Sequence, residues 1–300
     1  MIQTRRKRKT AALHLMLLPA VVVLAIYSYG PTLGSFIAFQ DFTAAQGFLK
    51  SPWIGFDNFT FVMRMPGFFS VIWNTVYISI LKMVGLIVVP VVVSLLLNEI
   101  AHEGFKRTIQ SMIYMPNFLS WVILSGTLIE ILSPSSGIVN GLLGFLGIKP
   151  IFFLGNTFWF PLTLVASEIW KTFGYSTVIY LAALTSIDPS LYEAATVDGA
   201  NRWQQMKNVT LPGILPIIVL MSVLSLGNIL NAGFDQVFNL YSPQVYDTGD
   251  ILDTFIYRLG LVEAQFGPAT AVGLFKTAVS LLFIVASYWM ADRFAKYRIL

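Results

Sequence analysis

The chain has 300 residues, of which 56% are hydrophobic and only 11% are charged, and its mean hydropathy is +0.73. Soluble domains carry about 25% charged residues, so this composition excludes a soluble domain and indicates a protein that crosses a membrane several times. The absence of cysteine excludes disulfides, cysteine-ligated zinc and iron–sulfur clusters, and the two histidines are too few for a metal cluster, so no metal site is expected.

Six apolar runs are long enough to cross the hydrocarbon core of a bilayer, which takes about 20 helical residues. They cover roughly residues 11–32, 71–97, 108–132, 158–184, 213–234 and 268–291. A further apolar stretch, 138–153, is broken by glycines and Pro150, so it is interpreted as an interfacial or re-entrant piece. The sequence therefore predicts an all-α membrane protein with about six transmembrane helices in one membrane domain, 11–291. A basic N-terminus, 1–10, and a short C-terminus, 292–300, flank this domain.

The distribution of lysine and arginine predicts the orientation of these helices, because cytoplasmic loops carry an excess of both. If the N-terminus is inside, the cytoplasmic side holds the basic run 5–9 with Lys106, Arg107, Arg202, Lys207, Arg293, Lys296 and Arg298, against Lys50, Arg64, Lys149 and Arg258 outside. Both termini are therefore expected in the cytoplasm. The first run is interpreted as a retained helix and not a cleaved signal, and its basic residues as a topology determinant, so no nucleic acid partner is expected.

The segment 185–212 is mostly polar and separates two of the long apolar runs. Asp188 followed by Pro189 is a typical helix start, and Gly199 can end that helix in a left-handed conformation. Asn201 can cap a second short helix, which leads into the next apolar run at Pro212. On these residues alone, the elbow is either a docking element for a soluble partner or a plain interfacial link between two helices.

The same segment carries a spaced pattern formed by Glu193, Ala194, Ala195, Gly199, Val209, Leu211 and Pro212. This pattern resembles the EAA signature in the membrane subunits of bacterial ABC importers, with valine at 209 where isoleucine is commoner. Segments at 53–59, 73–79, 114–123 and 169–195 are similar to the carbohydrate branch of these permeases, and 234–260 is similar to its polysaccharide and complex oligosaccharide subgroup.

The resemblance implies a type I ABC importer permease fold in a bacterial inner or plasma membrane. It also implies a homologous second permease subunit, two cytoplasmic ATPase subunits that bind ATP and Mg, an extracytoplasmic solute-binding protein and a saccharide substrate. The helix near 190–199 would sit in a cleft of one ATPase subunit. The residues expected to couple ATP hydrolysis to transport are then Glu193, Ala194, Ala195, Asp198, Gly199, Leu211 and Pro212.

The chain itself is not expected to be an enzyme or to hold a cofactor. The nearest look-alike of a phosphate-binding loop, GLFKT at 273–277, lacks the glycine–lysine pair and lies in an apolar run. An intramembrane enzyme would need paired carboxylates or an activated nucleophile at matched depth, and only Glu130 and Glu168 are acids in or near the apolar runs, so no catalytic residue is predicted. The remaining alternative is a secondary transporter or channel for a small polar solute, which would work without an ATPase.

Polar residues inside spans usually face the bundle interior or a water-filled path. Asn228, Asn231 and Asp235 are spaced i, i+3 and i+7, so on a continuous helix they would share one face and are predicted to line the substrate pathway. Gln236, Asn74 and Asn117 complete the predicted pathway set. The alternative is that these amides only form hydrogen bonds between helices. Glu168 and Lys171 are interpreted as a local ion pair on one helix, and Trp73 as a residue of the interfacial aromatic belt.

Overall fold

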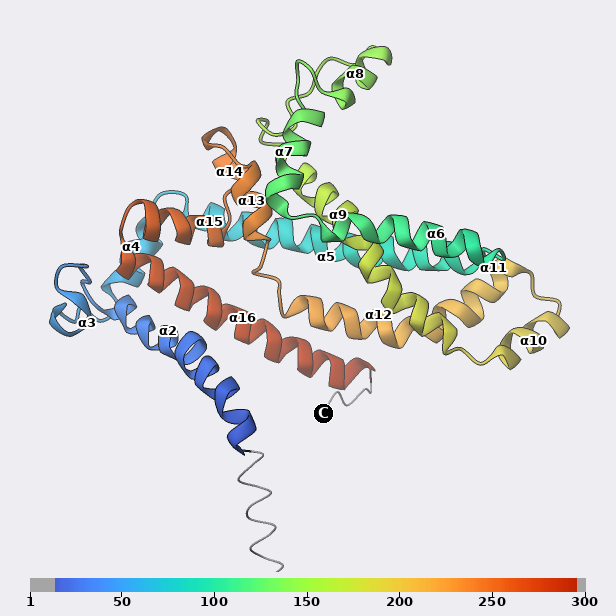
Figure 1. Ribbon diagram of the computed structural model, residues 1–300, viewed down its shortest axis with the longest axis horizontal. Helices are drawn as coiled ribbons and strands as arrows, with labels where there is room; N and C mark the ends of the chain where they lie inside the picture. Colours follow the sequence, from blue (N-terminus) through green and yellow to red (C-terminus); the bar gives the residue numbers. More distant parts are fainter. Residues whose placement is uncertain (1–13, 296–300) are drawn as a thin grey trace, which may run out of the picture. The chain divides into compact units, whose positions relative to one another are not determined.

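The computed structural model describes the backbone of residues 14–295 and side chains up to Trp289. The basic N-terminus and residues 296–300 of the predicted C-terminus lie outside the described residues. Within them the regular structure is helical, with a single isolated bridge between Gln40 and Trp53 (Figure 1). The predicted all-α fold is confirmed.

The described residues divide into two compact units, residues up to Met65 with Ile256–Phe275, and Pro66–Phe255 with the chain from Lys276 onward. The first unit contains the helical segment His14–Phe39, which includes η1 (Ala25–Tyr29), α2 (Gly30–Leu33) and η2 (Gly34–Phe39). It also contains α3 (Gly47–Lys50), α4 (Asp57–Arg64) and η6 (Arg258–Val262). The buried side chain of Asn58 holds this unit together by donating to the carbonyls of Ala38 (3.0 Å) and Gln40 (2.9 Å).

The second unit is built around two long helices, α5 (Phe68–Asn98) and α9 (Trp159–Thr185). In the sequence, four elements connect these two helices: α6 (Glu103–Tyr114), η3 (Met115–Phe118), α7 (Trp121–Ile131) and α8 (Ile138–Phe145). After α9 come α10 (Pro189–Val197), α11 (Arg202–Gln205), the π-helical η4 (Met206–Thr210), α12 (Leu211–Leu226), α13 (Phe234–Leu240), η5 (Pro243–Val245) and α14 (Tyr246–Gly249). Two helices, α15 (Leu252–Tyr257) and α16 (Phe266–Ala295), contribute residues to both units.

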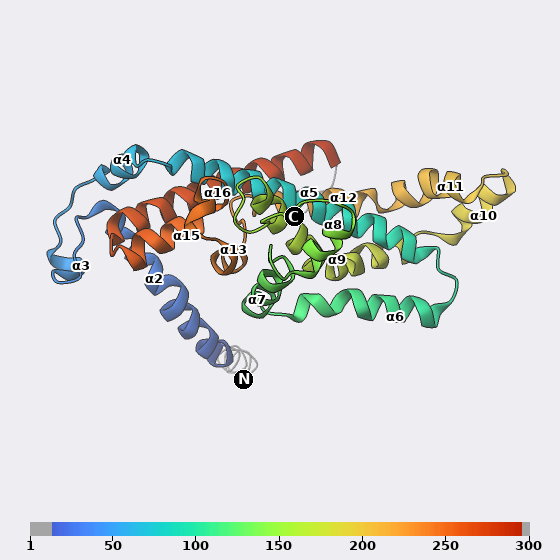
Figure 2. The same cartoon turned by 90° about the horizontal axis from the view of Figure 1, so that it is seen from above.

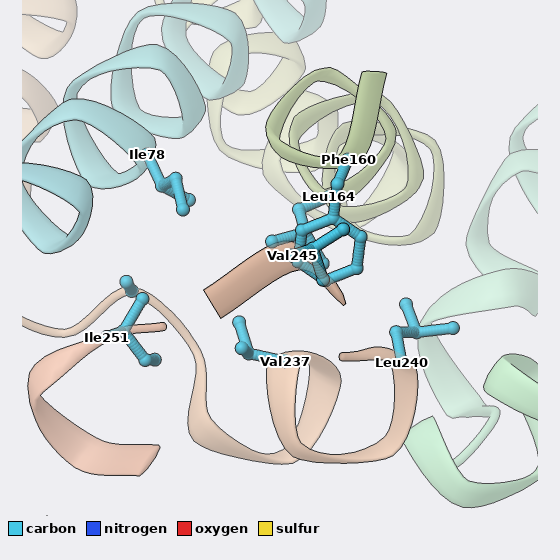
Figure 3. Packing of buried hydrophobic residues seen from close by; sticks show 8 residues of the cluster. Ile78, Phe160, Leu164, Val237, Leu240, Val245 and Ile251 are labelled. Atoms are coloured by element: carbon cyan, nitrogen blue, oxygen red, sulfur yellow. The ribbon is translucent and has the colours of Figure 1, made fainter. Parts of the chain in front are cut away.

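Two buried apolar clusters hold the second unit together. One brings Ile78 of α5 and Phe160 and Leu164 of α9 together with Val237 of α13 (Figure 3). The other joins residues of α5, α9 and α12, and includes Val91, Leu97, Tyr180, Leu181, Leu184 and Ile214. Each buried aliphatic side chain stabilises such a cluster by about 1.5–3 kcal/mol where it leaves water, so α5, α9 and α12 form the frame on which the polar residues are placed.

The predicted spans are confirmed in part. Four helical segments are long and apolar enough to cross a membrane: His14–Phe39, Phe68–Asn98, Arg202–Leu226 and Phe266–Trp289. The predicted span 108–132 is not one continuous helix, because Glu103–Phe118 and Trp121–Ile131 meet at a bend of 100°, as in a broken span or a re-entrant loop. The bend follows Pro116, and Ser120 starts the new helix by accepting a hydrogen bond from the Ile123 N–H. Helix α9 has 27 residues but is not one of these four segments.

The stretch 138–153 does not form a seventh span. Helix α8 has eight residues, which is about 12 Å of helix and too short to cross the membrane. The chain around it is held by Asn140, whose buried side chain donates to the carbonyls of Ser133 and Ile151 (both 3.0 Å) and accepts from the Ile151 N–H (2.8 Å). That the stretch 138–153 lies at the membrane–water interface, or re-enters the membrane, stays a prediction.

Candidate functional site

The elbow formed by residues 185–212 has the two-helix shape that its sequence predicts. The Asp188 side chain accepts a 2.9 Å hydrogen bond from the Ser190 N–H and so caps α10, with Pro189 in the first turn. This hydrogen bond favours the charged carboxylate and lowers the pKa of Asp188. The start of α10 is therefore fixed by contacts within three consecutive residues.

Gly199 ends α10 in the left-handed conformation that was predicted, with φ +78°. Its N–H donates to the carbonyl of Thr196 (3.0 Å), and the Ala200 N–H reaches back to the carbonyl of Ala195 (2.9 Å). This pair of bonds is a Schellman motif, which satisfies carbonyls that the end of a helix leaves free. The turn after α10 thus has a defined geometry.

The second half of the elbow begins at Asn201, as predicted. Asn201 and Gln204 form a reciprocal capping box at the start of α11, with bonds of 2.9 and 2.8 Å. The chain then passes through one π-helical stretch, η4, into α12, and Pro212 lies in the first turn of that helix. Leu211 and Pro212 are therefore placed at the start of α12 and not on α10.

Side-chain bonds cross the elbow and join its two halves. The Tyr192 hydroxyl lies 3.0 Å from Oγ1 of Thr210, at the end of η4. The Gln205 amide donates to Oγ1 of Thr196 (3.0 Å), and Thr210 is buried. These hydrogen bonds therefore tie α10 to the segment that leads into α12.

The outward side of the elbow is exposed and mixed in character. Glu193, Ala194, Asp198 and Gly199 are exposed, and Ala195 is half-buried. Val197 is 88% exposed. Figures 1 and 2 show α10 and α11 beyond the ends of α5, α9 and α12. The structure therefore brings the predicted coupling residues of α10 together on a projecting surface.

The predicted pathway residues are arranged differently from what the sequence suggested. Helix α12 ends at Leu226, and α13 begins only at Phe234. The prediction that Asn228, Asn231 and Asp235 share one helix face is therefore wrong, because the first two lie in the break between the two helices. Asp235 is an exposed residue of α13.

A cavity of about 320 Å³ opens beside this break. Asn228 and Asn231 line it, together with Ser79, Lys82 and Glu168. Two of the predicted pathway residues thus meet in one polar cavity. They do so through an irregular backbone, which is tolerated at membrane depth only where it is buried in protein or borders a cavity.

Lys82 of α5 holds the break in place. Its buried Nζ donates to the carbonyl of Ala232 (2.6 Å) and to Oε1 of Gln236, and it lies 3.7 Å from Oε2 of Glu168. The prediction that Glu168 pairs with Lys171 is therefore wrong. The Lys171 ammonium group instead donates to the carbonyl of Asn117 (3.1 Å).

Gln236 is completely buried and connects three helices. Its Nε2 donates to the carbonyl of Leu164 (2.7 Å) and to Oγ of Ser167 (2.8 Å), both in α9. Its Oε1 accepts from Lys82 in α5. These contacts are those expected of a residue that bridges helices, which was the alternative interpretation of the amides.

Asn74 and Asn117 do not line this cavity. Asn74 is buried and donates to the carbonyls of Asp247 (3.0 Å) and Asp250 (3.3 Å), so it attaches the α14 region to α5. Asn117 lies in η3 at the bend between α6 and α7, where its carbonyl accepts from Lys171. The sequence offered no signal that would have separated these two residues from Asn228 and Asn231.

Comparisons with known proteins show the family of the chain. Residues 15–297 match the model of the family described as "Binding-protein-dependent transport system inner membrane component". The chain is 39% identical over 284 residues to the polygalacturonan/rhamnogalacturonan transport system permease protein YteP of Bacillus subtilis (strain 168), covering 95% of this chain and 88% of that one. It is 36% identical over 282 residues to the protein LplB of the same strain, covering 94% and 89%.

The fold is similar to that of solved importers. A chain of a bacterial ABC transporter involved in the import of the acidic polysaccharide alginate superposes with a TM-score of 0.89 and 37% identity, over 98% of this chain and 99% of that one. An amino acid ABC transporter superposes with a TM-score of 0.50 at 17% identity, over 79% and 98%, and shows the fold alone. The resemblance seen in the EAA signature is confirmed, and the chain belongs to the family of inner membrane components of binding-protein-dependent transport systems.

Proposed function

We propose that the chain is one of two homologous membrane subunits of an ATP-driven importer for a polysaccharide or complex oligosaccharide. The substrate class is supported by the names of two similar proteins, a polygalacturonan/rhamnogalacturonan permease and an alginate importer. The coupling role rests on one observation: the exposed α10 surface around Glu193 belongs to an elbow whose shape is fixed by its own hydrogen bonds.

The proposed partners follow from this role. Two cytoplasmic ATPase subunits would bind ATP and Mg and receive α10 in a cleft, and a solute-binding protein would deliver the saccharide on the outer side. A similar solved importer was captured with a periplasmic protein that holds an alginate pentasaccharide. The excess of Lys and Arg on one side of the predicted spans supports cytoplasmic termini and a cytoplasmic elbow.

The elbow transmits motion in this proposal. When the ATPase cleft closes around α10, the bonds from Tyr192 to Thr210 and from Gln205 to Thr196 carry the displacement to α12. The other end of α12 is the break that presents Asn228 and Asn231 to the polar cavity. These two residues are proposed to line the saccharide path, while Gln236 positions the break.

The coupling proposal is tested by charge reversal at Glu193 in the complete importer, reconstituted in proteoliposomes. Glu193→Lys is expected to abolish the ATPase activity stimulated by the saccharide-loaded binding protein, because the cation would meet a surface suited to a carboxylate. Glu263→Lys, the same change at another exposed glutamate, serves as the matched control and should leave activity unchanged. Normal stimulated ATPase and uptake in Glu193→Lys would contradict the proposal.

The same proteoliposomes separate this function from a secondary transporter or channel. Omitting the ATPase subunits should stop saccharide uptake altogether. Uptake that continues without them would favour the alternative. For the pathway, Asn231→Ala should lower uptake and leave basal ATPase activity and the amount of folded complex unchanged, whereas a parallel loss of folded complex would indicate a purely structural residue.

A further inference from the structure

A second cavity, larger than the one at the break, lies between the first turns of α5, the start of α9 and α14. Its volume is about 600 Å³, within the range of roughly 300–1,000 Å³ that is typical of small-molecule sites. We call it the aromatic cavity, lined by Phe69, Ser70, Trp73, Asn74, Tyr77, Thr157, Phe158, Pro161, Asp247 and Thr248. None of these residues except Asn74 belongs to the predicted pathway.

One wall of the aromatic cavity is a row of aromatic rings on α5. Phe69, Trp73 and Tyr77 are spaced four residues apart, so they lie on one face of the helix. They are 69%, 67% and 40% exposed. The rings of Trp73 and Tyr77 are stacked, with centroids 6.4 Å apart and planes 15° from parallel. Together they present a flat apolar surface that residues 14–289 leave exposed.

The facing side of the aromatic cavity is polar. It carries the exposed carboxylate of Asp247, and Thr248 donates through its hydroxyl to the carbonyl of Thr157 (2.8 Å). The backbone of Asp247 is held against α5 by the side chain of Asn74 (3.0 Å). Among the described residues that line the cavity, Asp247 alone is charged. A flat apolar wall and a carboxylate carried on an anchored stretch of backbone therefore line the same cavity.

We propose that the aromatic cavity binds one sugar ring of the incoming saccharide, and that this ring carries no carboxylate of its own. The C–H face of a sugar ring matches the flat surface of Trp73 and Tyr77, and its hydroxyls donate to Asp247 in charge-assisted hydrogen bonds, which are stronger than neutral ones. A uronate in the same place would bring two negative charges together at short range.

The position of the aromatic cavity suits the first contact between saccharide and membrane subunit. It lies at the start of α5 and of α9, which are the ends that the charge distribution predicts to be outside the cell. An acyl chain of a lipid would match the aromatic wall but not the carboxylate. This inference rests on the proposed function, because it takes the substrate to be a saccharide.

The test measures direct binding of fluorescently labelled oligosaccharides to the purified importer complex without its binding protein. The probes are a rhamnogalacturonan tetrasaccharide, which contains neutral rings, and trigalacturonate, in which every ring is a uronate. The tetrasaccharide should bind more tightly than trigalacturonate. Trp73→Ala should weaken its binding by about tenfold or more, which corresponds to about 1.4 kcal/mol, and Trp73→Phe should restore part of the loss.

Two further variants sharpen the test. Asp247→Asn should weaken binding of the tetrasaccharide and reduce the discrimination against trigalacturonate, since the repelling charge is gone. Phe118→Ala removes an aromatic ring that is 83% exposed in η3 and outside the cavity, so it should change neither affinity. Co-purification of the second membrane subunit with Trp73→Ala shows whether the complex stays assembled.

Several results would overturn the aromatic cavity as a sugar site. The first is that the wild-type complex takes up saccharide but binds neither probe measurably. The second and third are equal binding of the two probes and unchanged binding in Trp73→Ala. The fourth is loss of the second membrane subunit from Trp73→Ala, because the surface would then be a subunit interface. Binding that persists in a complex unable to take up saccharide with ATP would instead contradict the proposed function and leave the sugar site standing.

Discussion

Lys82 and Ala232, 150 residues apart in the sequence, are joined by a hydrogen bond of 2.6 Å from the lysine Nζ to the alanine carbonyl. This carbonyl belongs to the break between α12 and α13, where the regular helical partners are missing. An unpaired backbone carbonyl costs several kcal/mol inside a membrane. Lys82 therefore makes it possible for the chain to leave the helix at the place where Asn228 and Asn231 reach the polar cavity.

Removing this ammonium group should destabilise the protein. Lys82→Met leaves the Ala232 carbonyl, Gln236 Oε1 and the Glu168 carboxylate without their shared donor, and breaking a buried pair from one side costs about 3 kcal/mol. We expect a lower free energy of unfolding for the purified complex in detergent. Lys50→Met, at an exposed lysine, is the control. Lys82→Met combined with Glu168→Gln should recover part of the loss, and no recovery would show that the charge of Glu168 is irrelevant.

Gly174 allows α9 to pass close to α6. A Cβ atom at this position would lie 1.9 Å from the carbonyl oxygen of Ile113, which is backbone and cannot turn aside. Gly174→Ala should therefore lower the free energy of unfolding by about 2 kcal/mol, as overpacking does. Gly126→Ala meets nothing within 4 Å and should be neutral or slightly stabilising, because alanine favours helix. Equal thermal midpoints for the two variants would refute the close approach of α9 and α6.

Gly199 is required by backbone conformation and not by space. Its φ is +78°, and a Cβ there would touch nothing within 4 Å. Gly199→Ala should cost the Schellman turn about 1–2 kcal/mol, while Gly199→Asn should cost less, because asparagine adopts this conformation more readily. Protection of the Ala200 amide from hydrogen exchange should decrease from glycine to asparagine to alanine at position 199. Stimulated ATPase activity should decrease in the same order. A variant order set by side-chain volume would contradict this view.

The cap at Asp188 gives the elbow a dependence on acidity. Its pKa in the folded protein is lowered from the ordinary value of 3.8 by the hydrogen bond from the Ser190 N–H. The contribution of this cap is therefore complete above pH 3.8 and is lost as the pH falls through the lower, folded value. Protection of the Ser190 amide from exchange should decrease over that window. Asp188→Asn keeps a capping oxygen without a titrating group, so its protection should not change there.

The local features of the elbow could be predicted from the sequence because their causes are local. Asp188, Gly199 and Asn201 each act on residues within five positions, and a capping residue carries its own signal. The family-specific pattern at Glu193 adds a predicted role to this shape, and that role stays a prediction. The positions of the predicted coupling residues within the elbow follow from these short-range rules.

The break after Leu226 could not be predicted in the same way. The run 213–234 is apolar throughout its first part and continuous in pattern, so it indicates one helix. The contacts that hold the break are tertiary: Lys82 donates to the Ala232 carbonyl and to Gln236 Oε1, and Gln236 attaches the start of α13 to Leu164 of α9. The partner of Glu168 was missed for the same reason, because Lys171 was near in sequence while Lys82 was near in space.

If the elbow docks on an ATPase subunit as proposed, its exposed apolar side chains would also link the amount of this subunit to the amount of that partner. Val197 and Trp203 are 88% and 69% exposed, on a surface that the proposed ATPase subunit would cover. A copy made in excess of that partner would keep both side chains in water, where chaperones and membrane proteases recognise such patches. The amount of permease that survives in the cell would then follow the amount of ATPase, because only subunits whose elbow is covered would escape degradation.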